Sequence, residues 1–114
     1  MLFSDTFSIP AGATDTPLSR RGSLFEFIKA PTILEIALIQ QTGAIGALLA
    51  SISSGTDILL EEGPIIVAAR FPVYPDDFFW RDEAAPPDRL RIATRNTTAG
   101  AIVCVTVVKF NPAF

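Results

Sequence analysis

The clearest pattern in this chain is an alternation of side chains in its last third. Between residues 88 and 95 one side of the segment is apolar or small and the other is basic: Leu90, Ile92 and Thr94 against Arg89, Arg91 and Arg95. A period of two indicates a β-strand with one buried face. After a polar turn at 96–100, residues 101–110 are rich in valine, whose restricted χ1 favours a pleated sheet. The pattern predicts that these two segments form a β-hairpin.

Shorter apolar runs earlier in the chain predict further strands. They lie at residues 23–28, 32–40, 57–60, 65–69 and 78–80, with residues 84–87 expected to form a loop. Residues 44–52 are ambiguous, because their apolar positions also fit one face of a helix. We favour a strand there, since turn residues flank the segment at 41–43 and 53–55 and its neighbours are strands.

Residues 1–22 have a different character, being mostly small and polar, with Phe3, Phe7 and Ile9 as isolated apolar residues. Such a segment is expected to extend as an N-terminal arm and to anchor its apolar side chains on a neighbouring molecule. The domain organisation predicted from these patterns is therefore an arm at 1–22 and a folded domain at 23–114. About eight short strands without a convincing helix predict an all-β, antiparallel two-sheet sandwich of the jelly-roll kind.

Composition adds an expectation about partners. Of the 114 residues, 49% are hydrophobic and 18% are charged, which is more apolar than a lone domain of this size readily buries. We therefore expect a homo-oligomer. The net charge of −3 offers no basic field for nucleic acid. Cys104 lies within the valine-rich run, where a buried apolar role is expected.

Two further segments bear on location. The N-terminus has no basic region followed by an apolar core, so we expect no secretion signal. The uncharged run 36–56 is interrupted by Gln40, Gln41 and several serines, which are costly in lipid, so no membrane span is expected.

Candidate chemistry is sparse. The chain has no histidine, which removes the commonest general base and metal ligand, and it has no glycine-rich phosphate loop. Carboxylates occur at positions 57, 61–62, 76–77, 82–83 and 88, without a diagnostic spacing. We interpret them as solvated loop charges, with a calcium site as the alternative. No catalytic, cofactor-binding or metal-binding residue is assigned, and we expect that the protein is not an enzyme.

The most suggestive local feature is a group of aromatic residues at 71–80. Phe71, Tyr74, Phe78, Phe79 and Trp80 are interpreted as packing or subunit-contact residues. The alternative is that they stack on a sugar ring, with Asp76, Asp77 and Arg81 as polar partners. The sequence 96–98 matches a glycosylation motif, but a turn between strands is the favoured interpretation.

Residues 90–101 and 71–77 give the chain a family resemblance. It resembles the small β-sandwich virion proteins of tailed and other DNA bacteriophages, namely capsid decoration (cement) and minor capsid proteins. The resemblance implies a trimer or pentamer in the virion that contacts the major capsid protein or other virion proteins and stabilises the shell. The contacts would come from the arm and from the aromatic segment 71–81, through Phe3, Phe7, Ile9, Phe71, Tyr74, Phe78, Phe79 and Trp80. The alternative function is a carbohydrate-binding β-sandwich, such as a receptor-recognition or spike domain.

Overall fold

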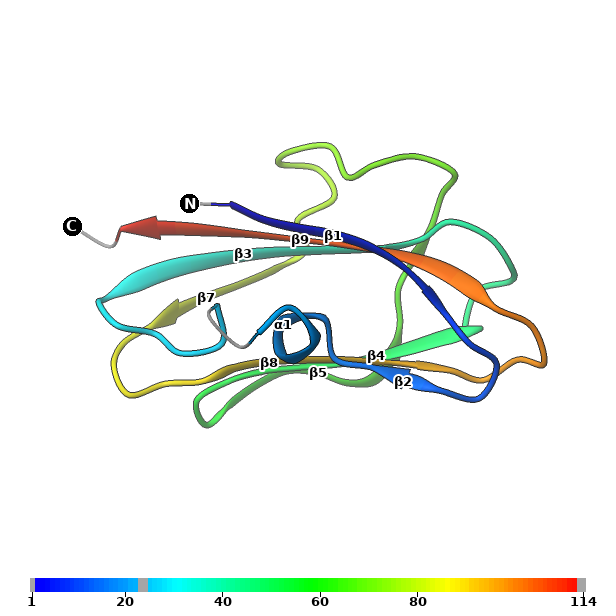
Figure 1. The fold of residues 1–114 in the computed structure, drawn as a ribbon. Coiled ribbons are helices and arrows are strands. Elements are labelled where there is room, and N and C mark those ends of the chain that lie inside the picture. The colour runs from blue at the N-terminus through cyan, green and yellow to red at the C-terminus, as the bar shows by residue number, and fades with distance from the viewer. Residues whose placement is uncertain (1, 23–24, 113–114) are drawn as a thin grey trace.

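The computed structural model describes residues 2–22 and 25–112, which form two β-sheets packed face to face (Figure 1). Sheet A consists of β1 (Leu2–Ile9), β9 (Ile102–Pro112), β3 (Thr32–Gln40), β6 (Ile66–Val67) and β7 (Trp80–Ala84). Sheet B consists of β2 (Thr14–Asp15), β8 (Leu90–Asn96), β4 (Leu48–Ser54) and β5 (Asp57–Pro64). A short helix, α1 (Pro17–Arg20), lies between the sheets and buries Leu18. The prediction of an all-β, two-sheet sandwich is confirmed.

The strands pair in a nested order. β1 pairs with β9, β2 with β8, β3 with β7 and β4 with β5, in every case antiparallel. Further antiparallel pairs join β3 to β9 and β4 to β8, whereas the short β6 runs parallel to β3. The first half of the chain is thus laid against the second half in reverse order.

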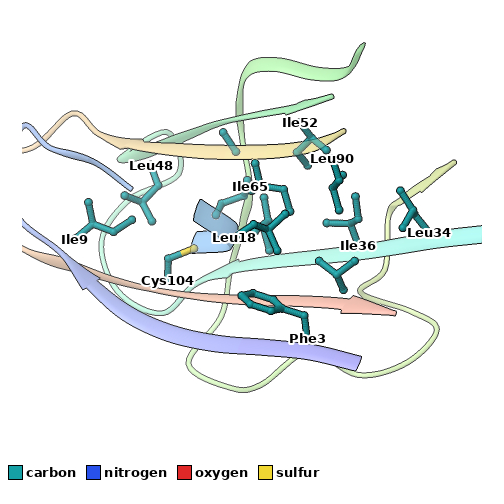
Figure 2. Packing of buried hydrophobic residues seen from close by; sticks show 14 of the residues in the cluster. Phe3, Ile9, Leu18, Leu34, Ile36, Leu48, Ile52, Ile65, Leu90 and Cys104 are labelled. Atoms are coloured by element: carbon teal, nitrogen blue, oxygen red, sulfur yellow. The ribbon is translucent and has the colours of Figure 1, made fainter. Parts of the chain in front are cut away.

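The core lies between the two sheets and follows the alternation of the strands. In β8, Leu90, Ile92 and Thr94 are all buried, as their spacing predicts, while Arg91 and Arg95 are exposed. Figure 2 shows side chains from both sheets and from α1 meeting in this layer. They include Phe3, Ile9, Leu18, Leu34, Ile36, Leu48, Ile52, Ile65, Leu90 and Cys104. Close packing of this interior is the main source of stability for such a domain.

The predicted hairpin between residues 88–95 and 101–110 is wrong, although both segments are strands. β8 belongs to sheet B and β9 to sheet A, so the turn at 97–101 carries the chain from one sheet to the other. Asn96 holds this turn, because its side-chain amide donates to the carbonyl oxygens of Gly100 at 2.8 Å and Ile9 at 3.0 Å. The second contact fastens the turn to the end of β1 and not to a hairpin partner.

The predicted N-terminal arm is also corrected for residues 2–22. β1 pairs with β9 over its whole length, from Leu2 opposite Lys109 to Ile9 opposite Ile102. Its inward side chains belong to the sandwich, as do β2 and α1. Two arginines make this possible. Arg20 and Arg21 bind the buried carboxylate of Asp5, which interrupts the otherwise apolar inner face of β1.

The remaining segments differ from expectation mainly at their ends. Residues 25–28 of the predicted strand 23–28 form only a single bridge, from Phe27 to Arg89, and residues 23–24 lie outside the described part. Residues 48–52 are a strand, as favoured, whereas 44–47 form a turn. The strand predicted at 65–69 shrinks to Ile66–Val67, and the one predicted at 78–80 begins at Trp80 and continues to Ala84.

Candidate partner-contact site

A loop of residues 68–79, here called the aromatic loop, covers the outer face of sheet A (Figure 1). Phe78 packs on Ala37 of β3 and on Val105 and Val107 of β9, forming a second, smaller apolar cluster outside the main core. This cover explains why the middle of β3 is buried on both faces, although only one face of the strand points between the sheets.

The loop is closed by an ion pair near its ends. The Arg70 guanidinium binds the Asp77 carboxylate in a two-pronged contact, with Nη2 3.1 Å from Oδ1. The Val73 backbone N–H donates to Asp77 Oδ2 at 2.8 Å, and the Asp77 N–H donates back to the Val73 carbonyl at 2.9 Å. The hydrogen bonds from Arg70 and from the Val73 amide favour the ionised carboxylate and lower the Asp77 pKa to about 2. The hydrogen bond between Arg70 and Asp77 also raises the pKa of Arg70.

Tyr74 fixes the tip of the loop to the sheet. Its hydroxyl lies 3.1 Å from each carboxylate oxygen of Glu35 on β3. Lys109 of β9 places Nζ 3.7 Å from the centroid of the Tyr74 ring, a cation–π contact, and Phe78 meets that ring edge-on. Asn111 donates to the same Glu35 carboxylate at 2.9 Å. An aromatic ring is therefore held beside a carboxylate, an amide and an ammonium group.

Between the loop and β1 lies an open groove of about 540 Å³. Its lining residues are Leu2, Ser4, Phe71, Pro72, Tyr74, Phe78, Val107, Lys109 and Asn111. Three of these residues form what is here called the aromatic patch. They are largely exposed: Leu2 to 57%, Phe71 to 62% and Tyr74 to 50%. Large apolar side chains that remain exposed beside a concave surface are typical of a binding site.

The structure brings together only part of the predicted contact set. Phe71, Tyr74 and Phe78 meet at the groove, whereas the exposed Phe79 packs edge-on against Trp80 away from it. Trp80 is half-buried and packs against the main core. This position agrees with the packing interpretation of Trp80 and not with the alternative, in which the residue stacks on a sugar ring.

The three apolar residues of the predicted arm face inward. Phe3 and Ile9 are buried in the core, at 3% and 0% exposure, so neither is available to a partner in this fold. Phe7 is half-buried, with the Arg20 guanidinium 3.8 Å from its ring centroid. The prediction of an arm was wrong because these side chains pack within the same molecule, in the core and against α1.

Among the residues that sequence reasoning did not assign to the groove are Leu2, Lys109 and Asn111, and it also missed Glu35 beside the groove. Lys109 and Asn111 are partly exposed at alternate positions near the end of β9, and that spacing is the signal that could have placed them on its outer face. Glu35 faces the same way, because it is paired with Lys109 across β3 and β9. Leu2 gave no such signal, because residues 1–22 were predicted to form an arm and not a strand.

The other predicted polar partners have different roles. Asp77 is committed to Arg70, and Arg81 lies opposite Glu35 in the pairing of β7 with β3. Across residues 2–22 and 25–112, no three metal-ligating side chains of the His, Cys, Asp or Glu kind come together. Within the same residues, no helix is long and apolar enough to cross a membrane.

The remaining shifted pKa values have structural causes in the core. Burial raises the pKa of the Cys104 thiol to about 12, as expected for a small side chain in an apolar layer. Arg20 bridges Asp15, at 2.8 Å, and Asp5, and the hydrogen bond that Arg20 donates to Asp15 is the main cause of its raised pKa. Both aspartates are buried, so the guanidinium neutralises charge between the sheets.

Comparison of the chain with protein-family models, with curated proteins and with solved structures gives no match.

Proposed function

We propose that this protein is a structural component of a bacteriophage particle, a capsid decoration (cement) or minor capsid protein. In this proposal it forms a closed homo-oligomer, a trimer or a pentamer, and stabilises the shell through contacts with neighbouring virion proteins. The observation that carries the proposal is the aromatic patch, an exposed apolar surface held in a fixed shape over the outer face of sheet A.

The packing of the sandwich supports a function at its surface. Side chains of both sheets fill the layer between them, and the inner positions of β3 and β8 are almost completely buried. A sandwich of this kind does not enclose a ligand as a wide barrel does. Binding then falls to the outer faces, where sheet A presents the groove.

The strand order supports a function as a capsid protein, by analogy of fold. The nested pairs, β1 with β9 through β4 with β5, are the order obtained when one long antiparallel ribbon is rolled into two sheets. We propose that the sandwich is a jelly roll on this basis. Jelly rolls occur in viral capsid proteins and lectins, so the fold favours these two classes without deciding between them.

The rigidity of the patch favours a protein partner. Tyr74 is tied to Glu35 and Lys109, and the loop behind it is closed by Arg70 and Asp77. A surface held in place before binding loses little conformational entropy when it docks. Apolar and aromatic anchors with charged groups at the rim are the usual anatomy of a protein interface.

Co-sedimentation with empty capsid shells of the phage that encodes the chain tests the proposal. The double variant Phe71→Ser/Tyr74→Ser is expected to weaken shell binding tenfold or more. The reason is that the two removed anchors together contribute about 1.4 kcal/mol or more to the binding free energy. The matched control is Ile58→Ser, which alters an equally exposed apolar residue, 67% exposed, on β5 of sheet B. Shell binding that is unchanged in the double variant contradicts the proposal.

The second candidate is a carbohydrate-binding sandwich. Its specific support is the cluster at the groove, where the Tyr74 ring lies beside the Glu35 carboxylate and the Asn111 amide. Planar polar side chains next to an aromatic ring are what a pyranose requires, since its C–H groups meet the ring and its hydroxyls need hydrogen bonds.

A glycan array distinguishes the two candidates. Sugar binding predicts hits that disappear in Tyr74→Ala and survive in Phe79→Ala, because Phe79 is exposed but does not line the groove. An array without hits, together with shell binding that depends on Phe71, selects the particle protein.

A further inference from the structure

Most edges of the two sheets are protected against pairing with another strand. β2 and β6 are only two residues long, and β7 carries Arg81, Asp82 and Glu83. β5 has breaks in its register with β4, two glutamates and a terminal proline. Short length, charge, bulges and proline are the devices by which natural sheets block edge-to-edge association.

β1 is the exception among the described edges. It is eight residues long and keeps one unbroken register with β9. Its other side pairs with no strand of the described chain. The side chains on its outer face are Leu2, Ser4, Thr6 and Ser8, which are uncharged. Such an edge presents a row of unpaired backbone donors and acceptors about 27 Å long to a further strand.

The one charge on β1 does not protect the edge. Asp5 points inward and is 7% exposed, and its two oxygens contact different arginines. Arg21 Nη1 lies 3.0 Å from Oδ1, and Arg20 contacts Oδ2. An inward-pointing charge repels an incoming strand when it is unpaired, but this carboxylate is already neutralised by two guanidinium groups.

We propose that β1 pairs with β1 of a second copy of this chain, antiparallel across a two-fold axis, so that sheet A continues from one molecule into the next. The partner strand is β1 of that second copy, because the other strand edges of the copy are blocked in the way just described. Pairing between copies through β1 alone is necessarily isologous and closes at two molecules, which avoids an open fibre.

The side chains favour one register. The strands must keep inward positions opposite inward positions, so only registers that pair residues of the same parity are allowed. A two-fold axis at Thr6 puts Thr6 opposite Thr6, Ser4 opposite Ser8 and Phe3 opposite Ile9. It also puts Asp5 opposite Phe7 of the other copy, whereas an axis at Asp5 would face the two aspartates with each other.

This contact borders the groove, because Leu2 and Ser4 of β1 also line it. It does not involve Phe71 or Tyr74, so its tests do not depend on what those two residues bind. If the patch contributes to a closed trimer or pentamer, β1 pairing joins two such rings. In every case the mass in solution is an even multiple of the 12.3 kDa chain.

Disulfide trapping tests the pairing. In Thr6→Cys, directly opposed residues would have Cα atoms about 4.5–5.5 Å apart, within the range a disulfide spans. Oxidised glutathione is then expected to convert most of the protein to a covalent dimer. The native Cys104 is buried and does not compete.

Ser8→Cys is the matched control, because Ser8 is exposed on the same face of the same strand. In the proposed register its equivalent in the second copy lies about 14 Å along the strand, too far for a disulfide. Ser8→Cys is therefore expected to stay uncrosslinked alone and to form a mixed dimer with Ser4→Cys. Equal crosslinking of Thr6→Cys and Ser8→Cys indicates random collision and overturns the proposal.

Light scattering after size exclusion gives an independent readout. Thr6→Lys places two like charges at the axis and is expected to halve the mass, while the circular dichroism spectrum stays unchanged. Thr56→Lys, in the exposed turn between β4 and β5, is expected to keep the wild-type mass. A folded Thr6→Lys variant with the wild-type mass also overturns the proposal.

Discussion

Arg70 and Asp77 close the aromatic loop, with Arg70 Nη2 3.1 Å from Asp77 Oδ1. The same carboxylate accepts the Val73 N–H at 2.8 Å, so one side chain organises both the ends and the interior of the loop. This ion pair therefore helps to hold Tyr74 and Phe78 over sheet A, together with the contacts of Tyr74 to Glu35 and Lys109.

Acid is therefore expected to loosen the loop. The Asp77 pKa is lowered from 3.8 to about 2, so ionised Asp77 stabilises the folded loop above pH 3.8. This stabilisation is lost as the pH falls from 3.8 towards 2. The Val73 amide resonance, followed by two-dimensional NMR, should shift with an apparent pKa near 2.

The Asp77→Asn variant provides the control for this titration. It keeps the size of the side chain and removes the charge, so the acid transition of the Val73 amide should disappear. A transition of the same size and midpoint in Asp77→Asn would show that another group controls the loop.

Asn96→Ala is expected to destabilise the sandwich by about 1–3 kcal/mol, because it leaves the Ile9 carbonyl without its side-chain donor. Urea unfolding measures the change. Asn111→Ala, which removes a partly exposed hydrogen bond to Glu35, should change the free energy of unfolding by less than about 0.5 kcal/mol. Equal effects of the two substitutions would mean that Asn96 does not fasten the inter-sheet turn.

Cys104 is expected to resist thiol reagents in the folded protein. Burial raises its pKa to about 12, so the reactive thiolate is scarce at neutral pH and the sulfur is also covered. Iodoacetamide labelling followed by mass spectrometry should show no modification in buffer and complete modification in denaturant. Labelling in buffer at the rate of a free thiol would place Cys104 at the surface.

Gly55→Ala is expected to cost more stability than Gly46→Ala. Both glycines have positive φ, +59° and +92°, so alanine carries a backbone cost of about 1–2 kcal/mol at either site. At Gly55 the new Cβ would also lie 2.6 Å from Asp88 Oδ1, whose other oxygen accepts the Ala85 N–H. At Gly46 no heavy atom lies within 4 Å of the new Cβ. Thermal unfolding of both variants measures the difference.

Much of the sandwich could be predicted from alternation alone. The inward face of β8, the strand at 32–40 and the burial of Cys104 were all predicted correctly. These features depend on the period-2 geometry of a single strand, which is local to the sequence. The aromatic group at 71–80 was interpreted as packing or subunit-contact residues; in the structure Phe78 and Trp80 are partly buried in packing contacts, whereas Phe71, Tyr74 and Phe79 are exposed.

β1 was missed because its inner face reads Phe3, Asp5, Phe7 and Ile9, with a carboxylate in a position that should be apolar. The two arginines that neutralise Asp5 are 15 and 16 residues away and reach it only after α1 has turned back. The groove was missed for a related reason, since Leu2, Tyr74 and Lys109 come from three separate segments.

Alternation along the chain was enough to assign the inner faces of β3 and β8 and the all-β sandwich class, because that pattern is local to each strand. It did not determine which strands are neighbours. A hairpin and a crossing between sheets both bury Leu90 and Ile92 in β8, so alternation cannot distinguish them. The tertiary structure decided between them through contacts between distant residues, above all the hydrogen bond from Asn96 to the Ile9 carbonyl, 87 residues apart.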